Sequence, residues 1–78
     1  MVTYDQDADI LYVRLSDGQV ASTRTLDDLR LIDVSADGEV IGIEFIDASG
    51  GIDLRDLPFR QRVEQLIGDS GYKIRILA

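Results

Sequence analysis

Apolar and polar side chains alternate along much of the chain, which is the period of a β-strand with one buried face. In the stretch that begins at Ile10, the side chains of Leu11, Val13 and Leu15 share one face. A second stretch is rich in Ser and Thr and is typical of an edge strand. The pattern predicts four strands, over residues 10–16, 20–26, 30–34 and 40–46.

Short turn signals separate these four stretches. Asp17-Gly18-Gln19 and Asp27-Asp28 favour tight turns, and Ser35–Glu39 is typical of a hairpin loop closed by Gly38. Because strands joined by short turns pair with their neighbours, the pattern predicts a four-stranded antiparallel β-meander.

The period changes after residues 47–51, where a Gly-rich segment breaks the sheet. The next apolar residues recur at helical spacing and predict a helix over 56–69; they are Phe59, Val63, Leu66 and Ile67. Alternation returns over 72–77 and predicts a short final strand. We therefore expect one α+β domain over 1–78, with the meander followed by one C-terminal helix and that strand.

A meander covered by one helix keeps its other face free. We expect the side chains of Ile10, Tyr12, Val40 and Ile46 on that free face, as candidates for an interaction surface. A patch of this kind favours a homodimer, while a monomer that covers the patch with its own termini is the alternative.

The composition narrows the chemistry. The chain has no His and no Cys, which removes zinc sites, thiolate nucleophiles and imidazole bases. No nucleophile, oxyanion-hole or phosphate-loop motif is present, and Ser49-Gly50-Gly51 lacks the Lys of a phosphate-binding loop. We therefore expect a protein without catalytic residues or cofactor, and not an enzyme.

The net charge is −7 and is unevenly distributed. Residues 1–54 carry twelve acids against three arginines, whereas residues 55–78 carry three acids against five bases. An acidic body disfavours nucleic acid and suits a basic protein partner. The sequence also shows neither a leader peptide nor a membrane-length apolar run, so we expect a cytoplasmic protein without a membrane partner.

Three aspartates near the start, Asp5, Asp7 and Asp9, are spaced like the opening of a calcium loop. The positions that such a loop needs as Gly and Glu are Ile10 and Ser16, so the motif fails. These aspartates stay candidates for a divalent-cation site, against the alternative of a solvated acidic lead-in whose carboxylates form turns and blunt the sheet edge.

Other charged residues are expected in ion pairs. Asp33 and Glu44 lie on neighbouring predicted strands, where pairing with Arg14, Arg24 or Arg30 is a more natural role than acid–base catalysis. A second group starts the predicted helix and is expected to pair with the acidic body; it consists of Arg55, Arg60 and Arg62.

Two blocks resemble a known family. Tyr4-Asp5 followed by Asp7–Val13 is similar to the opening Y-D-x-x-A-D-x-L-Y-I of domain-of-unknown-function family 2283. Asp37–Ser49 is similar to the later D-G-x-V-V-G-I-E-I-L-D-A-S of that family, with Phe45 and Gln6 as small departures. The resemblance covers 4–49 and implies a small bacterial or archaeal protein without an established activity. Some members are encoded beside small ribonuclease-type toxins, which implies candidate antitoxins.

Two functional hypotheses follow. The first is a non-enzymatic protein–protein interaction domain, in its most specific form an antitoxin-like partner of a basic protein. The second is a protein that binds a small ligand or a divalent cation through Asp5, Asp7 and Asp9 or through the Asp33/Glu44 pair.

Overall fold

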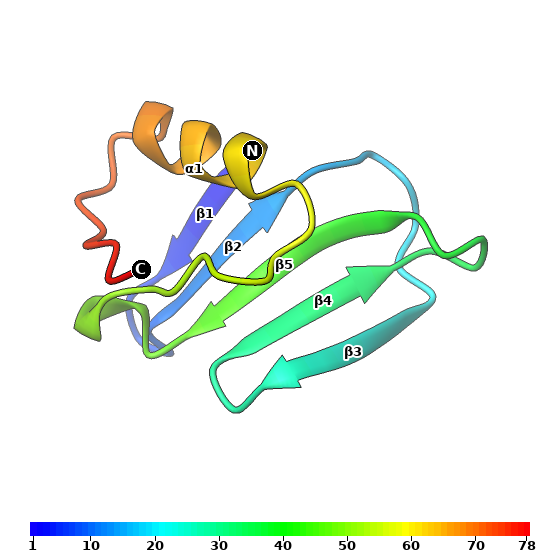
Figure 1. Cartoon of the computed structure of the whole chain (residues 1–78), viewed down its shortest axis with the longest axis horizontal. Coiled ribbons are helices and arrows are strands. Elements are labelled where there is room, and N and C mark those ends of the chain that lie inside the picture. Colours follow the sequence, from blue (N-terminus) through cyan, green and yellow to red (C-terminus); the bar gives the residue numbers. More distant parts are fainter.

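The chain forms a five-stranded antiparallel sheet with one helix, described over residues 1–78 by a computed structural model (Figure 1). The α+β class and the C-terminal helix are confirmed. The strand order is β1-β2-β5-β4-β3. The elements are β1 (Val2–Asp5), β2 (Ile10–Arg14), β3 (Ser22–Asp27), β4 (Arg30–Val34), β5 (Val40–Ile46), the 3₁₀ turn η1 (Ala48–Gly50) and α1 (Arg60–Asp69).

The order of the strands corrects the predicted four-stranded meander. Only β3, β4 and β5 follow one another as a meander, while β2 pairs with β5 instead of with β3. The segment after β2 is held at the end of the sheet, because the backbone N–H groups of Leu15 and Ser16 both donate to the Ile41 carbonyl, at 2.7 and 3.1 Å. Around Gly18 the chain therefore crosses to the far edge and does not close a hairpin.

A further correction concerns the N-terminus, where residues 2–5 form strand β1, which the prediction did not include. β1 pairs with β2 in the register Val2↔Val13 to Asp5↔Ile10. Val2 and Tyr4 are half-buried and pack against the core, whereas Thr3 and Asp5 are exposed. This alternation is a strand signal that is short enough to be obscured by the aspartates that follow.

The C-terminal part differs from the prediction at both ends. The helix begins at Arg60, because Asp56 and Phe59 have left-handed backbones, with φ of 63° and 55°, and form a turn. Gly71, with φ of 84°, follows the helix. The predicted final strand over 72–77 is not formed; a single parallel bridge joins Ile52 to Ile76.

The core lies between the sheet and the segment 51–67. Figure 1 shows α1 and the chain that leads into it on the same side of the sheet. Val63 and Ile67 of α1 are buried as the helical spacing predicts, but Phe59 is 63% exposed and does not join them. The core cluster comprises Leu11, Val13, Ile43, Phe45, Ala48, Ile52, Leu54, Leu57, Val63 and Ile67.

The edge strand β3 is exposed along its whole length, which confirms the edge position expected from its Ser and Thr content. Its register with β4 shifts between Thr25 and Asp27, and such a bulge bends an edge strand and hinders its pairing with another chain. No helix is long and apolar enough to cross a membrane.

Candidate functional site

The sheet face opposite α1, which we call the open face, carries half-buried side chains. Cross-strand partners share a face of a sheet, so Ile10 and Ile46 lie together there, as do Tyr12 and Glu44. None of these four side chains reaches the burial of the core. The predicted positions of Ile10, Tyr12 and Ile46 on a face away from the helix therefore agree with the register.

Val40, the fourth predicted residue of that surface, lies on the other side. The register between β4 and β5 shifts so that Val34, and not Ser35, is paired with Val40. Val34 is buried with Ile32 on the covered face, so its partner Val40 faces the same way. The inserted residue is Ile41, and this bulge is the physical reason for the wrong prediction.

A chain of hydrogen bonds crosses the open face. The Tyr12 hydroxyl donates to Asp33 Oδ2 at 3.0 Å, and the Thr23 hydroxyl donates to Asp33 Oδ1 at 2.6 Å. The Tyr12 ring reaches from β2 to β4 by passing over Gly42, where a Cβ atom would lie 2.2 Å from the Tyr12 hydroxyl oxygen. A glycine at position 42 is therefore required by the approach of Tyr12.

The surroundings of Tyr12 in this network change the pKa of its phenol. Burial, together with the hydrogen bond to Asp33 and its charge, raises the pKa of Tyr12 to about 12. Tyr12 therefore stays protonated at neutral pH and acts as a hydrogen-bond donor to the carboxylate. Glu44 forms no hydrogen bond or ion pair, so the open face carries a carboxylate with free acceptor oxygens.

The predicted ion pairs of Asp33 and Glu44 with arginines are not formed. Arg14 donates to the Gly18 carbonyl at 2.7 Å instead. Arg30 points to the covered side, where it is 7% exposed and pairs with Asp27 at 2.7 Å.

Buried Arg30 joins the sheet to the segment that precedes α1. Its guanidinium donates to the backbone carbonyls of Asp53 and Arg55, and to the Asp27 carboxylate. Charge-assisted hydrogen bonds of this kind satisfy a buried cation, and those from Arg30 hold the pKa of Asp27 below its usual range. This role is structural.

The two family-like blocks meet at the aspartate that ends the β1–β2 turn. Asp9 accepts hydrogen bonds from the Tyr4 hydroxyl at 2.6 Å, from the Ser49 hydroxyl at 2.6 Å and from the Ser49 N–H at 2.9 Å. The Ala48 N–H also donates to the Asp9 carbonyl at 3.1 Å. These bonds fasten η1 to the β1–β2 turn.

The same contacts decide what the early aspartates can do. The hydrogen bonds from Ser49 and then Tyr4 hold the pKa of Asp9 below its usual range. Asp5 Oδ1 accepts the N–H groups of Asp7 and Ala8, at 3.1 and 3.2 Å. No group of three or more acidic side chains in the structure is arranged to hold a metal ion, so Asp5, Asp7 and Asp9 are not brought together as a site.

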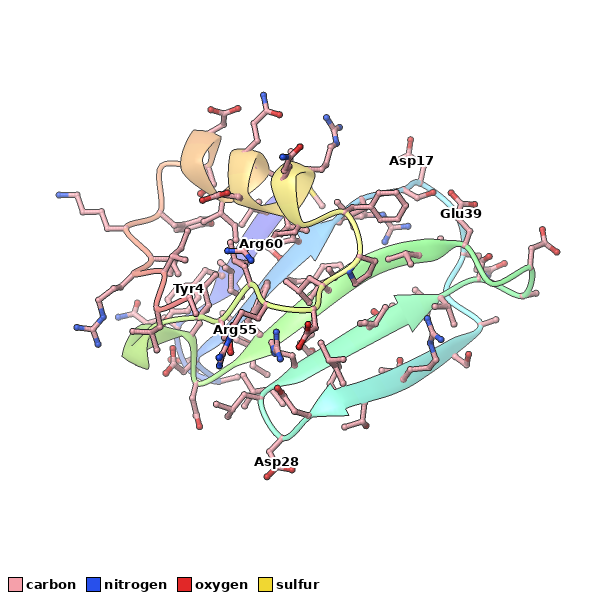
Figure 2. All side chains as sticks on the ribbon, in the orientation of Figure 1. Tyr4, Asp17, Asp28, Glu39, Arg55 and Arg60 are labelled. Atoms are coloured by element: carbon pink, nitrogen blue, oxygen red, sulfur yellow. The ribbon has the colours of Figure 1, made fainter.

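The basic residues of the C-terminal part are largely unpaired. Arg55 pairs with Asp53 at 2.8 Å, and this contact holds the pKa of Asp53 well below its usual range. Arg60 and Arg62 form no ion pair, contrary to the prediction. Figure 2 shows Arg55 and Arg60 on the side of the sheet that α1 covers.

The chain belongs to the family described as "Protein of unknown function (DUF2283)", whose profile matches residues 1–49. The match confirms the resemblance and covers the whole sheet together with the start of η1. No curated protein and no solved structure matches the chain.

Sequence reasoning missed how the shared residues of the family are used. Tyr4, Asp9 and Ser49 form one network although Ser49 is 40 positions from Asp9. The sequence did contain a signal for this network, because Tyr4 begins the first family-like block and Ser49 ends the second. The second missed contact, Tyr12 over Gly42, depends on a register that the chain pattern alone does not fix.

Proposed function

We propose that the chain is a non-enzymatic interaction domain whose open face binds a basic protein. The observation that carries the proposal is the unneutralised charge of the fold. Of the fifteen acids, only Asp27 and Asp53 are in ion pairs, so thirteen have no basic partner within the chain. Surplus charge of one sign steers and orients a partner of the opposite sign.

The open face has the composition of an interface. Glu44 and Asp33 supply negative charge, and the half-buried pair of Ile10 and Ile46 supplies apolar surface beside them. The hydrogen bond from Tyr12 to Asp33 holds the Tyr12 ring in place before any partner arrives, which lowers the entropic cost of binding.

The absence of His and Cys from the sequence supports the non-enzymatic part of the proposal. The most specific form is an antitoxin-like domain that covers a basic surface of a toxin. It agrees with the acidic body and with the genomic setting of some family members.

The test is capture from the native host with the tagged full-length chain, followed by binding measurements with the purified partner. We expect a basic protein in stoichiometric amount, bound more weakly as the salt concentration rises. Glu44→Gln should weaken binding by about twofold to fivefold, the effect of one exposed charge pair. Asp37→Asn is the matched control, because Asp37 lies in the exposed β4–β5 loop.

An acidic or neutral partner, or equal affinities for the wild-type chain and Glu44→Gln, would contradict the proposal. The antitoxin-like form has its own measurement. Co-expression of the chain should restore growth of cells that produce the captured partner, and the Glu44→Gln variant should restore growth less well at matched protein level.

A further inference from the structure

A second surface, which the proposed function does not use, surrounds the turn that precedes α1. A pocket of about 340 Å³ opens there between the end of the sheet and the helix. Figure 2 shows Glu39 at this end of the sheet, near Asp17. The pocket is lined by Leu15, Ser16, Glu39, Val40, Phe59 and Arg62.

The apolar part of this surface consists of one exposed aromatic side chain and the half-buried wall of the pocket. Phe59 is 63% exposed, while Leu15 and Val40 are half-buried in the wall of the pocket. Exposed aromatic side chains beside a pocket are typical of the residues that dominate protein interfaces.

The backbone at Phe59 is unfavourable for the residue that it carries. Its φ of 55° lies in the left-handed region, which bulky side chains rarely adopt. Gly would adopt this conformation without strain, and Phe59 does not compensate by joining the core. The sequence thus keeps an exposed aromatic ring at a position where the isolated chain gains little from it.

The charged part of the surface is complementary to itself. Glu39 and Arg62 carry opposite charges and line the same pocket, yet neither is in an ion pair. The Glu39 carboxylate accepts only the Ser16 hydroxyl, at 2.6 Å, and the guanidinium of Arg62 is in no hydrogen bond or ion pair. In a two-fold interface each residue meets the residues of the same patch on the other copy, so two such pairs would form at once.

We propose that this surface binds a second copy of the chain, with Phe59 of each copy in the pocket of the other. Glu39 of each copy then pairs with Arg62 of its partner. The interface leaves the open face free, so the proposal is independent of the basic partner proposed above.

The first experiment is sedimentation equilibrium of the full chain at 0.1 to 1 mM in salt of about 0.15 M, where the Debye length is about 8 Å and net-charge repulsion is screened. We expect a monomer–dimer equilibrium whose dissociation constant rises by at least about tenfold in Phe59→Gly. The same substitution should leave the melting temperature unchanged or raise it, because Gly relieves the left-handed strain. Loss of dimer in a stable variant therefore cannot be attributed to misfolding.

The second experiment separates pairing between copies from pairing within one chain. In Glu39→Arg and in Arg62→Glu the two-fold interface has like charges opposed, so each variant alone should be monomeric. An equimolar mixture of the two variants should form a heterodimer, because every cross-copy pair is then again of opposite sign. Glu64→Arg is the control, since Glu64 lies exposed on α1 and does not line the pocket.

Three results would overturn the proposal. They are a wild-type chain that is monomeric at 1 mM, a dimer that Phe59→Gly leaves intact, and a mixture of the two charge variants that stays monomeric. None of these results bears on the capture of a basic protein by the open face.

Discussion

The two faces of the sheet are made by the same strands and behave differently. On the covered face, Leu11, Val13 and Phe45 are at most 1% exposed and pack against the segment that ends in α1. On the open face, Tyr12 and Asp33 are connected by a hydrogen bond across β5, and no element packs over them. The covered face provides most of the burial that stabilises the fold, while the side chains of the open face stay partly exposed.

Two adjacent residues of β5, Glu44 and Phe45, give the most direct test of the difference between the two faces. Phe45→Ala removes a buried aromatic side chain and should cost about 3–5 kcal/mol in the free energy of unfolding. Glu44→Ala changes the open face and should cost less than about 1 kcal/mol. Urea unfolding followed by circular dichroism measures both values, and equal losses would contradict the assignment of the two faces.

The open face contains one position where packing is as strict as in the core. Gly42→Ala places a Cβ atom 2.2 Å from the Tyr12 hydroxyl oxygen and 2.9 Å from the Val13 carbonyl oxygen. We expect a loss of about 1–3 kcal/mol from overpacking. Part of that loss should disappear in the Tyr12→Ala background, as measured by a double-mutant cycle.

The matched control for this substitution is Gly50→Ala. A Cβ atom at Gly50 meets no heavy atom within 4 Å, so the variant should be close to neutral. If Gly42→Ala is also neutral, the register that places Tyr12 over β5 is wrong.

Acid should weaken the network of Tyr4, Asp9 and Ser49 at the end of the sheet. Because the pKa of Asp9 is lowered in the folded chain, the unfolded chain binds the proton more readily. The stabilisation from Asp9 is therefore complete above its ordinary pKa of about 3.9 and is lost as the pH falls through the folded value.

The measurement is the urea midpoint between about pH 5 and pH 2.5. Asp9→Asn should show a shallower decrease than the wild-type chain, while Asp37→Asn in the exposed hairpin loop should follow the wild type. A common slope for all three proteins would show that the hydrogen bonds from Tyr4 and Ser49 do not stabilise the charged form.

The smallest expected effect concerns divalent cations, the alternative ligand that the sequence suggests. Asp9 already accepts bonds from Tyr4 and Ser49, and Asp5 accepts two backbone N–H groups. We therefore expect millimolar Mg²⁺, Ca²⁺ or Mn²⁺ to leave the melting temperature unchanged in a thermal-shift assay. A concentration-dependent rise would favour the cation-binding hypothesis instead.

The sequence predicted much of the local structure, because local structure depends on periodicity and turn chemistry. The alternation from Ile10 to Arg14 and the helical spacing of Val63 and Ile67 both correspond to observed elements. The family was predicted from two short blocks and is confirmed by the profile over residues 1–49.

What the sequence did not predict depends on contacts between distant residues. The turn signal at Gly18 does not reveal which strand follows in space, so the pairing of β2 with β5 was missed. The bulge at Ile41 places the Val40 side chain on the opposite face from the one predicted, and Ile41 is not a residue type that indicates a bulge. Charge patterns likewise predicted pairs for Glu44 and Arg62 that the geometry does not form.

The central position of β5 has a consequence for how the chain acquires its structure. The strands β3, β4 and β5 connect through short loops and can pair locally, whereas β2 must find β5 across the 36 positions that separate Ile10 from Ile46. Closure of the longer loop costs more entropy before its contacts form. We therefore expect the β3–β5 meander to form first and the docking of the β1–β2 hairpin onto it to set the rate of folding, an order that φ-value analysis of the strands would test.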